Sequence, residues 1–385
     1  MKPFLYNMES VLSASNKKKF NVVSLFAGGG GSSTGYRLAG GDVLAINEFV
    51  ESARDTYKSN YPSTHIFEQD IRNLSCDDIL KETGLKKFEL DVLDGSPPCA
   101  SFSIAGKKEK LWGKKKKYSD TEQRVDDLFY EYARILNGLQ PKVFVAENVK
   151  GLTMGKSSNL LGSSQKSMFP SPIEEKTIFE TLTDCGYNVR YKVLNAKNYR
   201  VPQNRERLFI VGVRNDIKKR FKFPKRKKGL VTLGEALNDV KCIEMNRKAF
   251  NEEEPRRVER NGVCFTITAD GLGATRRYKV KRFGVNVSQK DRGDSSKDFR
   301  NAYDGVSPTI LTQYKGLANG LVEVEYGNEN VMRKLSIPEL KIICSFPIDY
   351  KLTGSYSKQW ERLGRSVPPL LMKSIAENIY ETVLK

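Results

Sequence analysis

The chain has 385 residues, 39% of them hydrophobic, and its 65 lysine and arginine residues outnumber its 46 acidic residues, giving a formal net charge of +19. This composition is typical of a soluble globular protein with room for a large core and a smaller one, so we expect two domains. No run of about 18 apolar residues occurs and no apolar h-region precedes Phe20, so we expect neither a membrane span nor a secretory signal, and an intracellular protein. The positive charge predicts a polyanionic partner, with nucleic acid as the first expectation, although a basic surface can also serve solubility alone.

A glycine-rich segment connects the first predicted strand to a helix. Residues 20–26 form an apolar run that predicts a buried strand, and residues 36–39 continue in a helical pattern. The four glycines at 28–31 would let a ligand approach the backbone near a helix N-terminus. The spacing is not the dinucleotide fingerprint, since Ser33 and Thr34 stand where its last glycine is needed, and a flexible loop is the alternative.

Acidic residues follow the next two apolar runs. Residues 42–47 predict a strand that ends in Glu48 and Phe49, where an acid commonly holds a pair of ribose hydroxyls. An acid that caps the following helix is the alternative. Residues 66–71 predict a third short strand, and its Asp70 could accept from an adenine amino group or could be a turn residue.

The sequence Pro97-Pro98-Cys99 follows an apolar run that begins at Asp91. Because prolines cannot donate to a sheet ladder, we expect the strand to stop at Cys99 and to present the thiol at the carboxyl edge of an α/β sheet, where ligands bind. A buried structural cysteine is the alternative. The six cysteines are scattered, so we expect no metal site, and His65 is the only histidine that could activate the thiol.

The middle of the chain predicts a loop, a helix and a strand. Residues 99–125 are typical of a lid or a solvated loop. Residues 127–139 have helical spacing with an apolar stripe that predicts core packing. Residues 141–151 predict a buried strand ending at Glu147, where desolvation would raise the pKa of the carboxyl and suit it to proton donation. The loop contains four lysines that could close over phosphates: Lys114, Lys115, Lys116 and Lys117.

Two more strands are expected at 191–195 and 199–213, and alternation would place Arg205 and Arg207 on the same side of the second strand. Such guanidiniums suit a base carbonyl or a phosphate, although surface salt bridges would give the same pattern. After Arg214, basic clusters and short strands predict a second, irregular domain. Helices are then expected to open at residues 333–340 and, after a turn, within 364–379.

Together these motifs resemble the DNA cytosine carbon-5 methyltransferase family, in the family's order and over nearly the whole chain. The segment 26–35 looks like its S-adenosylmethionine loop, and Pro98-Cys99 looks like its nucleophile motif. Glu147-Asn148-Val149 is similar to its acid motif, residues 203–207 to its arginine motif, and 364–367 to its last motif. The resemblance implies a Rossmann-like α/β methyltransferase sheet with an inserted smaller, irregular target-recognition domain. It divides the chain into a catalytic domain at 1–214, completed by 346–385, and a recognition domain at 215–345.

The resemblance also implies residue roles. Cys99 would add covalently to carbon 6 of a flipped cytosine while Glu147 acts at ring N3, and Arg207, with Arg205 in the same motif, would hold the ring O2. The cofactor implied is S-adenosyl-L-methionine, bound by Phe26, Ala27, Gly28, Gly29, Gly31, Glu48, Phe49, Asp70, Ile71, Pro98, Ser366 and Val367. The DNA contacts implied, besides the four lysines of the lid, are Arg276, Arg277 and Thr309.

Three positions depart from the family's usual pattern. Ser24 stands where an acid is common, Arg365 replaces the usual asparagine of the last motif, and Ala100-Ser101 replaces the glutamine that commonly follows the cysteine. Neither the nucleophile nor the acid is affected, but Arg365 bears on the contacts of the cofactor pocket.

The partner implied is double-stranded DNA, and we expect a monomer that is cytoplasmic and nucleoid-associated, with no membrane partner. A cognate restriction endonuclease could accompany it. A tRNA cytosine-5 methyltransferase of the related type has the same chemistry, but the long basic insert favours duplex DNA. A non-catalytic DNA-binding module and a nucleotide-dependent oxidoreductase are further alternatives, and neither accounts for Cys99 together with Glu147.

Overall fold

The computed structural model describes residues 4–98, 116–118, 121–123, 127–149, 177–232, 235–236, 264–265, 267–268, 271–272, 321–326, 329–334 and 336–385. Contacts divide the chain into two compact units. The sheet unit comprises Leu12–Leu194, Glu206–Lys225 and Met372–Lys385. The second unit comprises Met1–Val11, Asn195–Arg205 and Arg226–Leu371.

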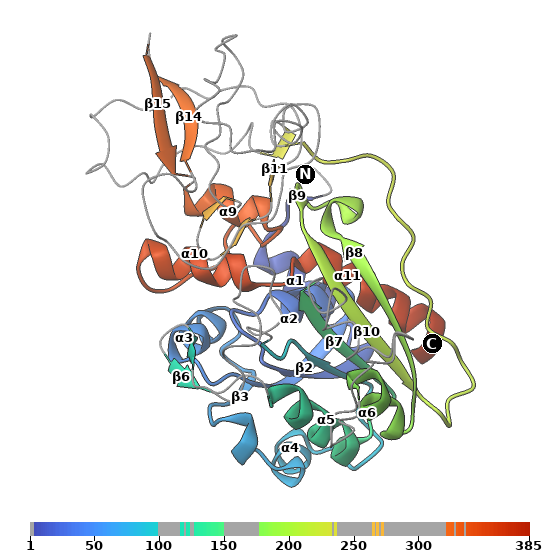
Figure 1. Cartoon of the computed structure of the whole chain (residues 1–385). Coiled ribbons are helices and arrows are strands. Elements are labelled where there is room, and N and C mark those ends of the chain that lie inside the picture. Colours follow the sequence, from blue (N-terminus) through green and yellow to red (C-terminus); the bar gives the residue numbers. More distant parts are fainter. Residues whose placement is uncertain are drawn as a thin grey trace, which may run out of the picture. The chain divides into compact units, whose positions relative to one another are not determined.

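The sheet unit contains a seven-stranded sheet with the order β3-β2-β1-β4-β7-β10-β8 (Figure 1). Neighbours from β3 to β7 pair in parallel, and β10 pairs antiparallel to β7. This arrangement confirms the expected α/β sheet. Its strands are β1 (Phe20–Leu25), β2 (Gly41–Asn47), β3 (His65–Phe67), β4 (Val92–Gly95), β7 (Val143–Val149), β8 (Tyr187–Asn195) and β10 (Glu206–Arg214).

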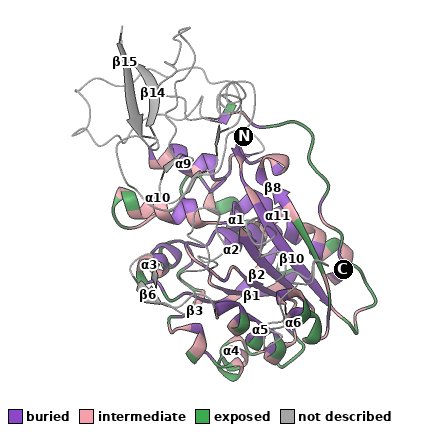
Figure 2. Cartoon of the chain, viewed as in Figure 1, coloured by how far each residue is buried: buried purple, intermediate pink, exposed green. Residues whose placement is uncertain are grey.

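Helices surround this sheet, and a short hairpin lies in the same unit. The helices are α2 (Gly31–Leu38), α3 (Glu51–Asn60), the 3-10 helix η1 (Ile71–Asn73), α4 (Cys76–Thr83), α5 (Leu128–Leu139) and α6 (Ile178–Asp184). The hairpin pairs β5 (Lys116–Tyr118) with β6 (Thr121–Gln123). Figure 2 shows the central strands buried and the outer faces of α4 and α5 partly exposed.

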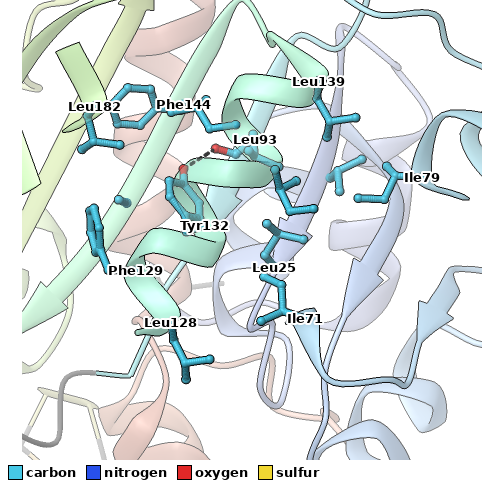
Figure 3. Close-up of a cluster of buried hydrophobic side chains, with 14 of the residues drawn as sticks. Leu25, Ile71, Ile79, Leu93, Leu128, Phe129, Tyr132, Leu139, Phe144 and Leu182 are labelled. Carbon is cyan, nitrogen blue, oxygen red and sulfur yellow. Dashed lines mark hydrogen bonds between the residues drawn. The ribbon is translucent and has the colours of Figure 1, made fainter. Parts of the chain in front are cut away.

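One face of the sheet packs an apolar cluster against α5 (Figure 3). Leu25, Leu93 and Phe144 supply this face from three neighbouring strands, and all are at most 1% exposed. Tyr132 of α5 lies among them and donates its hydroxyl to the carbonyls of Leu93, at 3.2 Å, and Val145, at 3.1 Å. The apolar stripe predicted for residues 127–139 is therefore core, as expected.

The opposite face of the same strands carries the polar side chains. Ser24 pairs with Asp94, and Asp94 pairs with Val145, in the parallel ladders. Because successive side chains alternate between faces, Ser24, Asp94 and Glu147 lie on the face away from the α5 cluster.

The second unit is described as short strands and three helical segments. The pairs are β9 (Gln203–Asn204) with β11 (Cys264–Phe265), β12 (Ile267–Thr268) with β13 (Gly271–Leu272), and β14 (Leu321–Tyr326) with β15 (Glu329–Lys334). The helical segments are η4 (Ala196–Tyr199), α9 (Ile337–Ile343) and α10 (Tyr356–Arg365). Helices α1 (Met8–Ser15) and α11 (Pro369–Ile379) contribute residues to both units, and α11 continues as the π-helix η7 (Tyr380–Leu384).

Several element ends differ from the expectations. Strand β4 ends at Gly95 rather than at Cys99, so the chain leaves the sheet before the two prolines. Helix α2 begins at Gly31, and α9 begins at Ile337, where Ser336 caps it and Glu339 completes a capping box. Helix α10 was not expected, and it includes Gly364, which we had assigned to a turn. Within the described part of the chain, no helix has the length and apolar character needed to cross a bilayer.

Candidate active site

The glycine-rich segment forms a tight turn at the carboxyl end of β1. Phe26, Gly28 and Gly30 all have φ in the left-handed region, at 55°, 56° and 86°. A Cβ added to Gly28 would meet no atom within 4 Å, so the loop borders open space. Helix α2 follows at once, and Gly30 at its N-cap offers no side-chain cap. Backbone N–H groups in the first turn of α2 are therefore available to an anionic group.

Glu48 fixes this loop from the end of the neighbouring strand β2. One carboxylate oxygen accepts from the backbone N–H of Gly28 at 2.7 Å, and the other accepts from the N–H of Val50 at 2.7 Å. The side chain is buried. A carboxylate has about four lone-pair sites, and these two N–H groups use one on each oxygen. Phe49, next in sequence, keeps an exposed ring.

Asp94 was not among the predicted site residues, and it is a buried acid on β4, paired with Ser24 of β1. It accepts from the hydroxyl of Ser24 at 2.7 Å and from the hydroxyl of Tyr36 in α2 at 3.2 Å. Burial raises its pKa to about 7, with the hydrogen bonds opposing the shift and the charge of Glu147 adding to it. Ser24, where the resemblance led us to expect an acid, thus donates to an acid on the neighbouring strand.

Glu147 and Arg207 form an ion pair between β7 and β10. Glu147 Oε1 lies 3.1 Å from Arg207 Nε, and the two side chains are 9% and 10% exposed. Burial lowers the pKa of Arg207 while the Glu147 carboxylate opposes that shift. Strand β7 runs two residues beyond Glu147, to Val149, so the glutamate lies within the strand rather than at its end.

A hydrogen bond joins the acid motif to the chain that leads into the thiol. Asn148, next to Glu147, donates its Nδ2 to the carbonyl of Pro97 at 3.3 Å. Pro97 is two residues before Cys99. Cys99 itself lies outside the described residues. The structure thus brings the Pro-Pro segment and the Glu-Asn-Val segment together, although 51 positions separate the bonded residues.

Arg205 and Arg207 have different partners. Strand β10 begins at Glu206, so the predicted continuous strand over 199–213 is wrong, and Arg205 lies between β9 and β10. Arg205 belongs to the second unit and donates to the carbonyl of Gly364 at 2.9 Å. At 1% exposure, its guanidinium supports the end of α10.

Comparison with known protein families identifies the family of this chain. A family model for C-5 cytosine-specific DNA methylases covers residues 20–381. The chain belongs to that family. Among curated relatives, the Type II methyltransferase M.Bsp6I of a Bacillus species is 30% identical over 375 residues, which cover 94% of this chain and 99% of that protein. M.NgoPII of Neisseria gonorrhoeae is 28% identical over 374 residues, covering 94% and 96%.

A solved structure shares the fold of this methylase. It is described as a DNA modification methyltransferase encoded within an E. coli prophage, and it matches with a TM-score of 0.60 and 19% identity over 95% of this chain and 100% of that chain. The methylase is therefore a DNA cytosine-5 methyltransferase with the S-adenosylmethionine-dependent methyltransferase fold. The expected family, fold class and enzyme class are confirmed.

S-adenosylmethionine is the cofactor of this methylase family, and the residues present fit it. The uncapped N-terminus of α2 suits a carboxylate, and Glu48 suits a hydroxyl pair. Ser33 in the first turn of α2 has a fully buried hydroxyl with no hydrogen-bond partner among the described residues, which a bound ligand could satisfy.

Other residues of the expected cofactor set have local roles. Both carboxylate oxygens of Asp70 accept from Arg72, one from its backbone N–H at 3.0 Å and one from its guanidinium at 2.7 Å. Asp70 thereby caps η1, which is the turn role considered as the alternative, and Ile71 is buried. Pro98 is half-buried at the end of a described segment.

The last motif lies in the second unit. Arg365, which replaces the usual asparagine, places its Nε 2.9 Å from Glu361 Oε1 within α10. Ser366 follows that helix, with its N–H donating to the carbonyl of Arg362 at 3.2 Å, and Val367 is buried. Arg365 therefore forms an ion pair within its own helix.

The expected DNA contacts are largely outside the described residues. Arg276, Arg277, Thr309, Lys114 and Lys115 are not described. The remaining two lysines of the run, Lys116 and Lys117, lie in β5, so the predicted loop contains a hairpin strand.

His65 lies in the edge strand β3, with Nδ1 2.9 Å from Glu82 Oε1, and two strands separate β3 from β4. Within the part of the chain that is described, no group of three or more metal-binding side chains occurs.

Proposed function

We propose that this methylase works through a covalent bond between the Cys99 sulfur and carbon 6 of a cytosine flipped out of double-stranded DNA. The observation that carries the proposal is the bond between Asn148 and Pro97, which ties the segment before Cys99 to the strand holding Glu147. Carbon 5 of cytosine is a poor nucleophile, and adding a thiolate at carbon 6 activates it. Because the ring must reach the sulfur, the base has to leave the duplex stack.

Glu147 and Arg207 would receive the charge that develops when the thiolate adds. Glu147 would donate a proton or a hydrogen bond to ring N3, and Arg207 would donate to the ring O2. Their ion pair holds both groups in a nearly dry environment, so neither needs to reorient for the reaction. S-adenosylmethionine supplies the methyl group when it is bound. Loss of the carbon-5 proton to a base then expels Cys99.

The cofactor would be held mainly by the glycine loop and its neighbours. Glu48 would accept from the ribose hydroxyls, and the exposed Phe49 would contact the adenine ring. Asp70 and Ile71 would border the adenine. The remaining contacts are assigned to Phe26, Ala27, Gly28, Gly29, Gly31, Pro98, Ser366 and Val367.

DNA would be recognised by the segment 215–345, with catalysis by 1–214 and 346–385. Phosphate contacts are assigned to Lys114, Lys115, Lys116, Lys117, Arg276 and Arg277, with Thr309 at the position that reads bases. The Type II names of the relatives support a restriction-modification role, with a cognate endonuclease as its partner. We also propose that the enzyme acts as a monomer.

Bisulfite sequencing of DNA from cells that express the protein tests this function directly. We expect protected cytosines at one short sequence with the wild-type enzyme and none with Cys99→Ser. Methyl incorporation into purified tRNA serves as the comparison. Incorporation into tRNA but not into DNA would assign the chemistry to the alternative substrate.

A further inference from the structure

Asn47, the last residue of β2, connects the chain segments that follow three neighbouring strands. It is 2% exposed. On one side, its backbone carbonyl accepts from the N–H of Ala27 in the glycine loop at 3.1 Å. On the other side, its Nδ2 donates to the carbonyls of Phe67, at the end of β3, and Gln69, both at 2.9 Å. A single residue therefore ties the glycine loop to the end of β3.

The side-chain amide of Asn47 fixes the path of the chain beyond β3. Strand β3 ends at Phe67, so the carbonyl of Gln69 lies where the sheet ladder has stopped and needs another donor. An amide has two N–H donors, and Asn47 uses them on two carbonyls that are two residues apart. The turn 68–70 is thereby held against the end of β2, and Asp70 lies in that turn.

Arg54, in the first half of α3, makes a second connection to the same turn. Its Nη1 donates to the carbonyl of Phe49 at 2.7 Å, and its Nη2 lies 3.3 Å from Glu68 Oε2. The guanidinium thus bridges the turn 48–50 to the turn 68–70. Glu68 is exposed, and an ion pair in water contributes little to the stability of a fold. What this contact can contribute is a fixed separation between the two turns.

The turn after β2 has an anchored backbone and an exposed ring. The N–H of Glu48 donates to the carbonyl of Phe67 at 3.1 Å, and the carbonyl of Phe49 accepts from Arg54. The Phe49 ring remains exposed on this backbone. Ordering a loop upon binding costs affinity, so a ring that is already held in place can meet a planar ligand without that cost.

We propose that Asn47 and Arg54 are positioning residues for S-adenosylmethionine. They hold the turns 48–50 and 68–70 at the separation that the adenosine part of the cofactor requires, before the cofactor binds. This inference rests on the cofactor contacts that we propose for the two turns. Both N–H donors of the Asn47 amide are used on protein carbonyls, so that amide acts through the turns. All of these residues belong to the sheet unit.

Three variants test the two residues. Asn47→Leu keeps the approximate size of the side chain and removes its donors. Asn47→Asp keeps the shape but points an acceptor at the two carbonyls, so it should bind the cofactor at least as weakly as Asn47→Leu. Arg54→Met removes the guanidinium and keeps most of the aliphatic stem. Urea denaturation without ligand shows which variants are folded, and Arg54→Met decides if both Asn47 variants fail to fold.

Two matched controls lie at the opposite, amino edge of the parallel strands. Asn21→Leu, near the start of β1, removes the acceptor for the N–H of Asp91 at 2.7 Å. Arg214→Met, at the end of the antiparallel β10, removes a donor to the carbonyl of Phe88 at 3.3 Å and an ion pair with Asp216 at 2.7 Å. Each control thus loses the same kinds of contact as the residue it matches.

Calorimetry measures the binding of two ligands, S-adenosylhomocysteine and methylthioadenosine, and the second of these lacks the amino-acid part. We expect Asn47→Leu to weaken both by the same factor of about tenfold or more, and Arg54→Met by about threefold or more, because the turns are no longer held for the adenosine. The controls should change either affinity by less than about twofold. In steady-state methylation, the KM for S-adenosylmethionine should rise in Asn47→Leu and Arg54→Met, while kcat and the KM for DNA stay at wild-type values.

Three results would overturn the positioning role. They are wild-type affinity in folded Asn47→Leu and in Arg54→Met, an equal loss in the matched controls, and a loss for S-adenosylhomocysteine without one for methylthioadenosine. Glu48→Ala separates this inference from the proposed ribose contact. Weaker binding in Glu48→Ala alone would overturn only the positioning role, whereas weaker binding in the Asn47 and Arg54 variants alone would overturn only the ribose contact.

Discussion

Glu147 Oε1 lies 3.1 Å from Arg207 Nε across the antiparallel pair of β7 and β10. Both side chains are buried, and the opposite charge of each offsets part of the cost of burying the other. The pair sits on the sheet face that also carries Asp94, opposite the apolar cluster of α5. A buried acid and a buried guanidinium on one strand pair are what the proposed contacts to N3 and O2 of one pyrimidine ring require.

Glu147→Gln removes the proposed proton donor and keeps the shape of the side chain. We expect single-turnover methyl transfer to fall by about 100-fold or more, because general acid catalysis contributes about that much. S-adenosylmethionine affinity, measured by calorimetry, should be unchanged. Glu381→Gln, at an exposed position in η7, should leave both quantities unchanged. Wild-type rates in Glu147→Gln would remove this residue from the chemistry.

Arg207→Met removes the guanidinium that forms the ion pair with the buried Glu147 carboxylate. We expect urea denaturation to show a loss of about 3 to 5 kcal/mol in the free energy of unfolding, because breaking a buried ion pair by removing one member is strongly destabilising. In the double variant with Glu147→Gln, the loss should be smaller than the sum of the two single losses, since no carboxylate is left to lose that pair. Additive losses would mean that the two groups do not interact.

Glu48→Ala removes the acceptor for the N–H groups of Gly28 and Val50 as well as the proposed ribose contact. We expect S-adenosylmethionine to bind about tenfold or more weakly, because the N–H groups of Gly28 and Val50 lose their acceptor and the loop loses its support. Glu48→Gln keeps one carbonyl oxygen and should have an intermediate affinity. Unchanged calorimetric affinity in Glu48→Ala would exclude the ribose role.

Asp94→Asn should change how stability depends on pH. Burial raises the Asp94 pKa from 3.8 to about 7, so the folded protein binds this proton more tightly than the unfolded chain does. Binding of this proton to Asp94 stabilises the folded protein fully at pH values below the Asp94 pKa of the unfolded chain. That stabilisation is lost as the pH rises through the Asp94 pKa of the folded protein. We expect this group to lower wild-type stability by up to roughly 4 kcal/mol between about pH 4 and pH 7.

The asparagine variant cannot ionise and should lack that decrease. Urea midpoints at several pH values between these limits measure it, and Asp55→Asn on the exposed side of α3 is the control that should follow the wild type. The same decrease in Asp94→Asn and in the wild type would show that Asp94 is not the titrating group.

Much of the fold follows from local patterns in the sequence. The apolar runs before the glycines and before Glu147 predict β1 and β7, and the stripe that includes Tyr132 predicts α5. Helix α10 was missed although Tyr356, Trp360 and Leu363 have helical spacing, because Gly364 suggested a turn there. The preference of glycine for turns is outweighed at Gly364 by the burial of this residue in the last turn of α10.

The lateral neighbours in the sheet could not be predicted. Asp94 becomes a buried, hydrogen-bonded acid only because Ser24 lies 70 positions away on the adjacent strand, and Tyr36 lies 58 positions away on α2. In the same way, Arg205 and Arg207 are two positions apart in sequence, yet they contact Gly364 and Glu147. The two arginines differ because β10 begins at Glu206, which leaves Arg205 outside the strand and Arg207 inside it. Where a strand begins depends on its pairing with other strands in the folded protein.

The most direct test of covalent catalysis uses duplex DNA in which 5-fluorocytosine replaces the target base. Fluorine at carbon 5 cannot leave as a proton does, so the enzyme should stay bonded to the base through Cys99. We expect mass spectrometry to detect a protein–DNA adduct that requires S-adenosylmethionine and is absent in Cys99→Ser. If the wild-type enzyme methylates ordinary DNA but forms no such adduct, the proposed role of Cys99 is contradicted.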